Sequence, residues 1–150
     1  MENKITNQIK LEFLSKGENV ALARVTIAAL VSQLEITLSE LEEIKVAVSE
    51  AVSNAILHGY QNEIDKIVIL KGTLSDDLLC IEVIDQGIGI HNIEQAMEPA
   101  YSTDPERTGL GFVFMQSFMD EVKVESRINH GTKVILRKKI STALKNSAVS

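Results

Sequence analysis

Three short motifs of this chain carry side chains that could do chemistry, and they occur in order along it. The first holds Glu50 and Asn54, which are four residues apart in a stretch of helical periodicity and would share one helix face. An amide oxygen is a suitable ligand for Mg²⁺, and a carboxylate one turn earlier could accept a proton from an attacking hydroxyl. In isolation, this spacing is more often the solvated face of an amphipathic helix.

The second motif, residues 85–89, follows an apolar run that is typical of a buried strand. The carboxylate of Asp85 could accept a hydrogen bond from the exocyclic amine of adenine. Gly87 and Gly89 remove side chains where a base must lie close to the backbone, and they permit positive φ. An ordinary strand-ending turn explains this motif about equally well. A dinucleotide fingerprint is excluded, because the third glycine is missing.

The third motif places Gly109 and Gly111 at the start of a predicted helix. Backbone N–H groups at a helix N-terminus attract phosphate, and Arg107 could hold a terminal phosphate as a forked donor. A surface arginine beside a flexible turn is the more frequent case. Together and in this order, the three motifs predict an ATP site with a metal ligand, an adenine reader and a phosphate-binding turn. The sequence of a P-loop is absent.

The elements that must position these motifs follow from the periodicity of apolar residues. Alternation predicts strands over 5–13, 67–74, 78–84, 122–126 and 132–138. Helical spacing predicts helices over 20–34, 39–59 and 110–119, with a capping box at Ser39 and Glu42 and a C-terminal stop at Gly59. Residues 90–108 are predicted to be mostly loop, with one helical turn near 92–97. Two antiparallel hairpins favour a two-layer α/β sandwich over a doubly wound sheet.

Length and composition predict one globular domain over residues 1–150, with a frayed tail over 141–150. The chain has no run of about 18 apolar residues and no signal-peptide pattern, so we expect a cytoplasmic protein without a membrane span. Its single cysteine, Cys80, rules out an internal disulfide and is expected to be an inert core thiol. The net charge of −6 argues against direct nucleic-acid binding and permits a basic protein partner.

The three motifs resemble the ATP-binding fold shared by gyrase, Hsp90, histidine kinases and MutL. Residues 50–59 look like the N-box of that superfamily, and residues 85–89 and 109–111 look like its two glycine boxes. Gly131-Thr132 resembles the threonine region near its final strand. The resemblance extends from about Ile5 to Lys139 and implies an α+β fold. That fold is a two-layer sandwich of the Bergerat type, with a mixed, mostly antiparallel sheet and helices on one face.

Residues 23–29, 48–60 and 118–122 are also similar to the sporulation anti-sigma factors of endospore-forming bacteria. This resemblance implies a homodimer that holds sigma F inactive when bound to ATP or ADP. It also implies a protein serine/threonine kinase, not of the Hanks type, that uses ATP and Mg²⁺ to phosphorylate an anti-anti-sigma factor. The segment over residues 98–106, which would form a lid over the phosphates, departs from the family pattern at Asp104, where a lysine is expected.

The resemblance also implies a role for each matching position. Glu50 would be the catalytic base, Asn54 the Mg²⁺ ligand and Asp85 the adenine reader, with Thr132 supporting that carboxylate. Arg24 matches a position on the partner-binding surface. The positions that would shape the base pocket and the phosphate lid are Gly87, Gly89, Arg107, Thr108, Gly109 and Gly111.

Two other interpretations of the motifs remain open. In the first, the nucleotide gates affinity for a partner and no phosphate is transferred, so that Asp85 and Asn54 are needed but Glu50 is not. In the second, the chain is a related stress-response anti-sigma kinase with other partners, and only surface residues such as Arg24 would differ. The chain has no room for a phosphoacceptor helix pair or a transducer domain, so we expect it to act on other proteins in trans.

Overall fold

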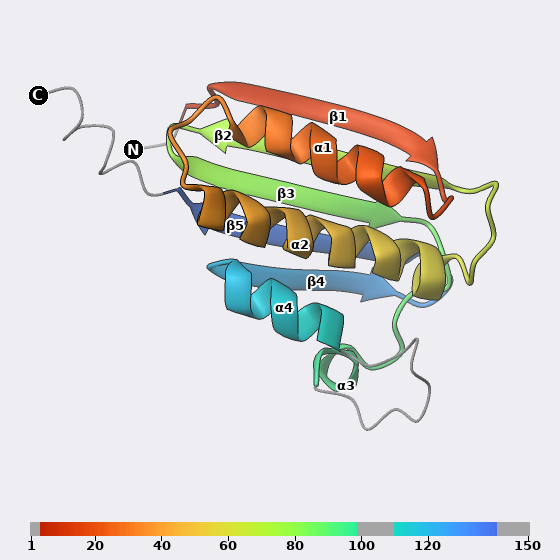
Figure 1. Cartoon of the computed structure of the whole chain (residues 1–150). Helices are drawn as coiled ribbons and strands as arrows, with labels where there is room; N and C mark the ends of the chain where they lie inside the picture. Colours follow the sequence, from red (N-terminus) through yellow and green to blue (C-terminus); the bar gives the residue numbers. More distant parts are fainter. Residues whose placement is uncertain (1–3, 99–109, 141–150) are drawn as a thin grey trace, which may run out of the picture.

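The computed structural model describes residues 4–98 and 110–140 of the chain (Figure 1). Its strands are β1 (Asn7–Leu14), β2 (Ile67–Ser75), β3 (Leu78–Asp85), β4 (Glu121–Arg127) and β5 (Gly131–Lys139). Its helices are α1 (Asn19–Val31), α2 (Leu38–Asn54), α3 (Ile93–Met97) and α4 (Leu110–Phe118), and a π-helical turn, η1 (Ala55–Gly59), extends α2. The predicted tail over 141–150 lies outside the described residues.

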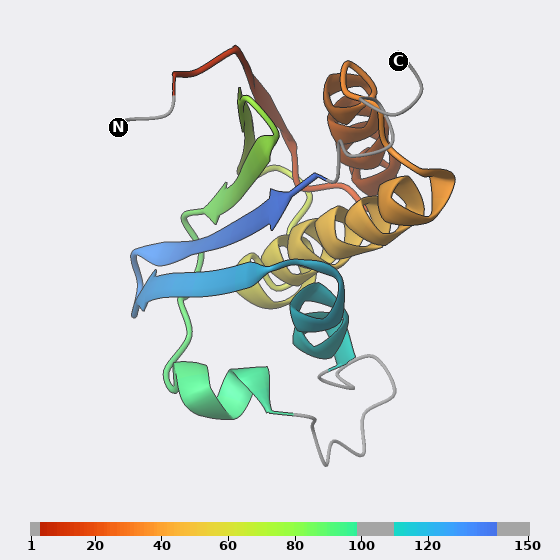
Figure 2. The same cartoon turned by 90° about the vertical axis from the view of Figure 1, so that its left-hand side faces the viewer.

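The five strands form one sheet in the order β1-β2-β3-β5-β4, and each of these four pairings is antiparallel. The turn between β2 and β3 has only two residues, of which Asp76 has a φ of 57°. The helices α1, α2 and α4 cover one face of the sheet, as the turned view in Figure 2 shows. The prediction of an α+β two-layer sandwich with helices on one face is confirmed, as are both hairpins. The sheet was predicted to be mixed, but all pairings among the described strands are antiparallel.

The N-cap of helix α2 lies two residues before the predicted cap. The side chain of Thr37, which has extended backbone angles, accepts a hydrogen bond from the N–H of Glu40 at 3.1 Å. The predicted capping box at Ser39 and Glu42 was therefore wrong, because Ser39 already lies inside the first turn and Thr37 satisfies the free N–H groups there. In the described part of the chain, none of the helices combines the length and the apolar character needed to cross a membrane.

The core lies between the sheet and the helix layer. The alternation along β3 sends Leu79, Ile81 and Val83 toward the helices, where all three are buried. A glycine on β2 lets α1 approach closely, since a β-carbon on Gly72 would lie 2.8 Å from Cδ2 of Leu30. Packing in the core therefore fixes the positions of α1 and α2 relative to the sheet. The helix α2 carries the first of the predicted motifs.

No helix among the described residues covers the other face of the sheet, which carries exposed and half-buried charges such as the Lys133–Glu82 pair at 3.4 Å. Cys80 lies on this face and is only half-buried, so the prediction of a core thiol was wrong. The reason is strand periodicity, which places Cys80 on the side of Glu82, opposite to Ile81. Partial burial still raises the pKa of the Cys80 thiol, which keeps it protonated and unreactive.

Candidate functional site

A pocket of about 550 Å³ is bounded by α2 and η1, by α3 and α4, and by the strands β3 and β5. Six of the predicted site residues line it: Glu50, Asn54, Asp85, Gly89, Gly111 and Thr132. Residues from motifs far apart in the sequence therefore meet in a single cavity, at one end of the helix layer.

The helix α2 presents Glu50 and Asn54 to this pocket because its apolar stripe faces the sheet. Val48, Ala51 and Val52 are buried in the core, whereas Glu50 and Asn54 are half-buried on the adjacent face. Burial raises the pKa of Glu50 above the ordinary value of a glutamate. The carboxylate is thus a better proton acceptor than an exposed glutamate would be.

The N-terminus of α4 closes over these two side chains. A β-carbon on Gly111 would lie 2.9 Å from Oε2 of Glu50 and 3.4 Å from Nδ2 of Asn54. The first turn of α4 therefore lies next to the carboxylate and the amide, and the backbone N–H groups of a helix N-terminus attract phosphate. Chemically, this end of the pocket offers a proton acceptor, a neutral oxygen ligand and anion-binding N–H groups.

The helix that carries Glu50 runs on into the π turn η1 and brings its end against Asp85. The N–H of Tyr60 bonds to the carbonyl of Ala55 at 2.9 Å, five residues back. Gly59 ends the helical segment as predicted, and the structure adds a second reason for a glycine there. A β-carbon on Gly59 would lie 2.7 Å from the carboxylate of Asp85, so a larger residue there would displace that carboxylate.

Asp85 is the last residue of β3 and is 5% exposed. Burial raises the pKa of its carboxyl to about 6, against the lowering effect of hydrogen bonds from the N–H groups of Gly87 and Thr132. The bond from Gly87 to Oδ1 measures 2.9 Å. A carboxylate this poorly solvated is a strong acceptor for an N–H group of a ligand, which would restore part of the lost hydration.

The glycines around Asp85 serve different purposes. Gly89 has a φ of 77° and lines the pocket, in agreement with the prediction of positive φ. Gly87 lines a neighbouring cavity instead, and its φ is not positive. A β-carbon on Gly87 would fall 1.9 Å from the carbonyl oxygen of Gly59, so Gly87 is needed for the turn to pack on η1.

Thr132 on β5 is the register partner of Asp85 on β3. Its Oγ1 lies 2.8 Å from Oγ of Ser126, which also accepts a hydrogen bond from the N–H of Ile90 at 2.7 Å. Ser126 therefore connects the threonine to the segment that follows Gly89. Sequence reasoning did not identify this serine, because its partners lie on two other segments, at Ile90 and at the start of β5.

The pocket also has apolar walls that sequence reasoning did not identify. They come from β3, β5, the segment after Gly89, and the helices α3 and α4, and the residues are Val83, Val134, Ile90, Ala96 and Phe112. Gln95 of α3 lines the same cavity. The alternation of apolar residues in the sequence predicts that Val83 is buried. Its place in the wall of this pocket follows only from the assembled sheet.

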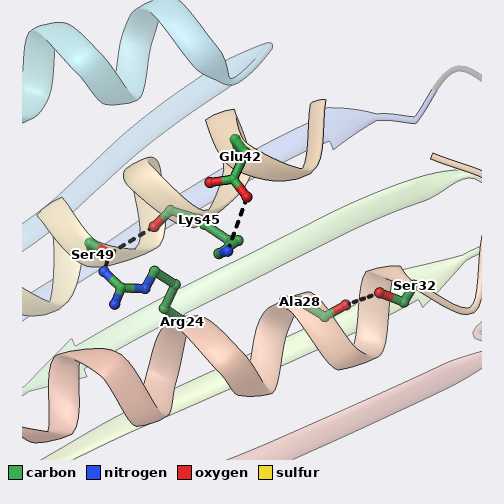
Figure 3. A network of polar contacts seen from close by, with 6 residues as sticks. All are labelled: Arg24, Ala28, Ser32, Glu42, Lys45 and Ser49. Atoms are coloured by element: carbon green, nitrogen blue, oxygen red, sulfur yellow. Dashed lines mark hydrogen bonds and ion pairs between the residues drawn. The ribbon is translucent and has the colours of Figure 1, made fainter. Parts of the chain in front are cut away.

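Arg24 does not line the pocket. It lies on α1 and faces α2, where its Nη1 is 3.4 Å from Oγ of Ser49, and Ser49 in turn donates to the carbonyl of Lys45 at 2.8 Å (Figure 3). Ser49 directly precedes Glu50, so the predicted partner-binding position contacts the helix that carries the predicted base. The lid residues Arg107, Thr108 and Gly109, together with Asp104, lie outside the described residues.

The arrangement fits an adenine nucleotide with Mg²⁺. Asp85 offers an acceptor for an exocyclic amine between apolar walls, while Glu50, Asn54 and the start of α4 line another part of the same pocket. Glu50 and Gly59 are nine residues apart, which corresponds to about 13 Å along a helix and suits an extended nucleoside triphosphate. Within residues 4–98 and 110–140, no group of three or more His, Cys, Asp or Glu side chains could hold a metal ion. A metal at Asn54 would thus rely on phosphate and water for its other ligands.

Comparison with known protein families gives one match over most of the chain. Residues 13–138 match the family described as the histidine kinase-like ATPase domain. In a comparison with solved structures, the chain is similar to a crystal structure of the RsbU and RsbW domains of Rv1364c from Mycobacterium tuberculosis, with a TM-score of 0.66 and 19% identity. That likeness covers 91% of this chain and 33% of the other.

The chain is also similar to the catalytic domain of the histidine kinase ThkA, with a TM-score of 0.58 and 17% identity over 90% of this chain and 98% of the other. Among characterised sequences, it is 50% identical to the anti-sigma F factor of Clostridium beijerinckii over 137 residues, which is 90% of this chain and 96% of the relative. It is 49% identical to the anti-sigma F factor of Geobacillus thermodenitrificans, over 90% of this chain and 94% of the relative.

Proposed function

This chain belongs to the histidine kinase-like ATPase family and, within it, to the anti-sigma F factors, and on that premise we propose what it does. It binds an adenine nucleotide, inhibits the sporulation factor sigma F, and phosphorylates a serine of an anti-anti-sigma factor. It acts as a homodimer in the cytoplasm. The observation that carries the proposal is the meeting of Glu50, Asn54 and Gly111 in the same pocket as Asp85 and Thr132.

The base of the nucleotide lies at the Asp85 end of the pocket. The carboxylate accepts a hydrogen bond from the exocyclic amine of adenine, and Thr132 holds the carboxylate in place through its N–H. Val83 and Val134 supply apolar surface for the faces of the ring. A guanine base would present a carbonyl oxygen to Asp85 at this point, and the two acceptors would repel each other.

The phosphates lie at the Glu50 end, near the first turn of α4. Backbone N–H groups there bind phosphate oxygens, and Arg107, Thr108 and Gly109 complete the lid. Asn54 would contribute an oxygen to Mg²⁺, which when bound would neutralise phosphate charge. Most of the catalytic effect of such a site comes from positioning and from charge neutralisation.

Phosphotransfer requires a base for the serine hydroxyl of the partner. Glu50 accepts that proton while the serine oxygen forms its bond to the γ-phosphorus and the bond between this phosphorus and the departing ADP oxygen breaks. The raised pKa of Glu50, which results from burial, suits the carboxylate for this role. A surface carboxylate with an ordinary pKa would hold the transferred proton less well.

The partner surface includes Arg24. Its guanidinium makes one long contact of 3.4 Å to Ser49 and keeps further N–H donors for an acidic group of the partner. The first strand and helix form the surface between the two subunits of the dimer, since the nucleotide motifs occupy the other elements. The outward side of α1 is apolar enough for this purpose, with Val25 61% exposed.

The deciding experiment mixes the protein with γ-labelled ATP, Mg²⁺ and the anti-anti-sigma protein and follows the label on a gel. We expect label on the partner with the wild type and none with Glu50→Ala or Glu50→Gln, while both variants still bind ATP. The matched control is Glu42→Gln, an exposed position on the same helix whose ion pair with Lys45 contributes little.

Two outcomes would contradict parts of this proposal. Wild-type turnover in Glu50→Gln would remove the catalytic role of Glu50. Tight ATP binding with no label on any protein would favour the nucleotide-gated binding module over the kinase.

A further inference from the structure

The side chain of Tyr60 connects the helix that carries Glu50 and Asn54 to the turn that follows Asp85. Tyr60 comes directly after η1 and is 7% exposed. Its Oη accepts a hydrogen bond from the N–H of Gln86 at 2.7 Å and donates one to the carbonyl of Ile67. One phenol group therefore joins the end of the helix, the start of β2 and the residue next to Asp85.

The π turn is what directs Tyr60 toward Gln86. In η1 the N–H of Tyr60 bonds to Ala55, whereas an uninterrupted α-helix would pair it with Ile56. The π turn thus holds one residue more than an α-helical turn. If the α-helix continued without it, Tyr60 would be rotated by roughly 100° around the helix axis from its present direction. The hydroxyl would then point away from Gln86.

Backbone contacts of Gly59 complete this connection. The N–H of Ile88 bonds to the carbonyl of Gly59 at 3.0 Å, and Gly87 packs directly on the same carbonyl. The turn over residues 86–88 is therefore held from one side by η1 and by Tyr60. Tyr60 lines the neighbouring cavity with Gln86 and Gly87, while Asp85 faces the nucleotide pocket.

We propose that Tyr60 is a positioning residue for adenine recognition, which holds the N–H of Gln86 so that the Asp85 carboxylate meets the exocyclic amine of the base. This inference rests on the proposed nucleotide-binding function. Removing the hydroxyl would leave the N–H of Gln86 without its acceptor and allow the turn to shift. Asp85 would then lose its alignment, although Tyr60 itself touches no part of the nucleotide.

The test compares the wild type with Tyr60→Phe by titration calorimetry, using ADP and inosine diphosphate. Inosine diphosphate has a carbonyl in place of the amine and offers Asp85 no N–H at that position. We expect the affinity for ADP to fall about tenfold, as for the loss of one well-placed hydrogen bond, and the affinity for inosine diphosphate to stay unchanged. The preference for ADP therefore shrinks by the same factor.

The matched control is Ser15→Ala. Ser15 is a buried hydroxyl that donates to the carbonyl of Glu63 and accepts from the N–H of Lys66 at 3.1 Å, so it bridges the backbone of the loop that follows Tyr60 in the same manner. Its partners belong to that loop and not to the turn over 86–88. We expect Ser15→Ala to keep the wild-type preference for ADP, even where it lowers the unfolding temperature.

Three results would overturn the role of Tyr60: an unchanged ADP affinity in Tyr60→Phe, an equal loss for both nucleotides, or rapid hydrogen exchange of the Gln86 amide in the nucleotide-free wild type. The exchange measurement needs no variant and stands even where Tyr60→Phe fails to fold. A wild type that binds ADP and inosine diphosphate equally would overturn the adenine-reading role of Asp85 and thus the proposed function as well. The first three results leave that function intact.

Discussion

The α-carbon of Gly111 lies directly over the carboxylate of Glu50, so that a β-carbon on this residue would come within 2.9 Å of Oε2. The contact joins the start of α4 to the side chain that we propose as the base. The atom in the way is the far end of a flexible side chain, which can move aside at little cost to the fold. The consequence of a substitution here is a displaced carboxylate in a folded protein.

Gly111→Ala should therefore separate stability from phosphotransfer. We expect stability to be unchanged or to rise by up to about 1 kcal/mol, because alanine is the better residue in a helix. The rate of phosphotransfer should fall by about 10²-fold, as for a catalytic group moved by about 1 Å. Thermal unfolding and a labelled-phosphate assay measure the two effects.

The control for this variant is Gly17→Ala, because a β-carbon on Gly17 would meet no atom within 4 Å. It should transfer phosphate at the wild-type rate. A Gly111→Ala protein with full activity would mean that the position of Glu50 under α4 does not matter to the reaction.

Asp85→Asn should abolish adenine-nucleotide binding and yet stabilise the nucleotide-free protein at pH 7. Burial raises the pKa of Asp85 to about 6 from 3.8, so at pH 7 the folded state holds a charge that the unfolded state solvates better. A shift of this size corresponds to about 3 kcal/mol. As pH falls through 6 toward 4, the wild-type carboxyl takes up its proton and this disadvantage disappears. Urea unfolding of both proteins between pH 4 and 7 measures the difference.

Asp65→Asn is the matched control, since Asp65 is an exposed aspartate and lies outside the nucleotide pocket. Its stability relative to the wild type should stay nearly constant over the same pH range. The interpretation fails if Asp85→Asn is less stable than the wild type at pH 7, or if it still binds ADP.

Arg24→Ala should weaken partner binding and leave the nucleotide site intact. The guanidinium makes a single 3.4 Å contact to Ser49 and lines no part of the pocket. We expect the affinity for the sigma factor to fall tenfold or more, as is common for a central interface arginine, with ATP affinity unchanged. Surface plasmon resonance with the immobilised sigma factor and calorimetry with ATP give the two values.

A matched variant for this experiment is Arg137→Ala. Arg137 pairs with Glu121 at 2.9 Å on the uncovered face of the sheet, away from α1. It should bind the sigma factor as the wild type does. Equal losses in both arginine variants would indicate a general effect of charge and would count against a specific role for Arg24.

Val25→Glu should convert the proposed dimer to monomers. Val25 is 61% exposed on α1, and a carboxylate there would be buried without a partner in the proposed dimer surface. Sedimentation velocity measures the mass directly. Ile64→Glu provides the comparison, because Ile64 is also 61% exposed but lies in the loop between η1 and β2. A dimeric Val25→Glu protein would place the subunit contact elsewhere.

Much of the fold was predictable because the relevant signals are local. Alternation of apolar residues identified the strands, and the apolar stripe of α2 placed Glu50 and Asn54 on one face. The N-cap of α2 was missed by two residues, since Thr37 and Ser39 are both good caps and only backbone conformation distinguishes them. Cys80 was misplaced for a different reason: the apolar run around it hid the alternation of β3.

The parts of the site that could not be predicted depend on contacts between distant segments. The role of Gly87 follows from the carbonyl of Gly59, and that of Ser126 from Thr132 and Ile90. The π turn has no sequence signature that distinguishes it from α-helix, so the direction of Tyr60 was hidden as well. Motif spacing identified which residues meet, whereas the packing of backbone on backbone determines how they are held.

The pairing of Asp85 with Thr132 has a consequence for folding during synthesis on the ribosome. Thr132 belongs to β5, which is synthesised last among the described elements. A nascent chain whose β5 has not yet left the ribosome lacks one side of the base end of the pocket. ATP therefore cannot stabilise the fold of such a chain by binding there. Mass action by the nucleotide begins only after β5 has joined the sheet, and it then draws chains with a complete pocket toward the folded state.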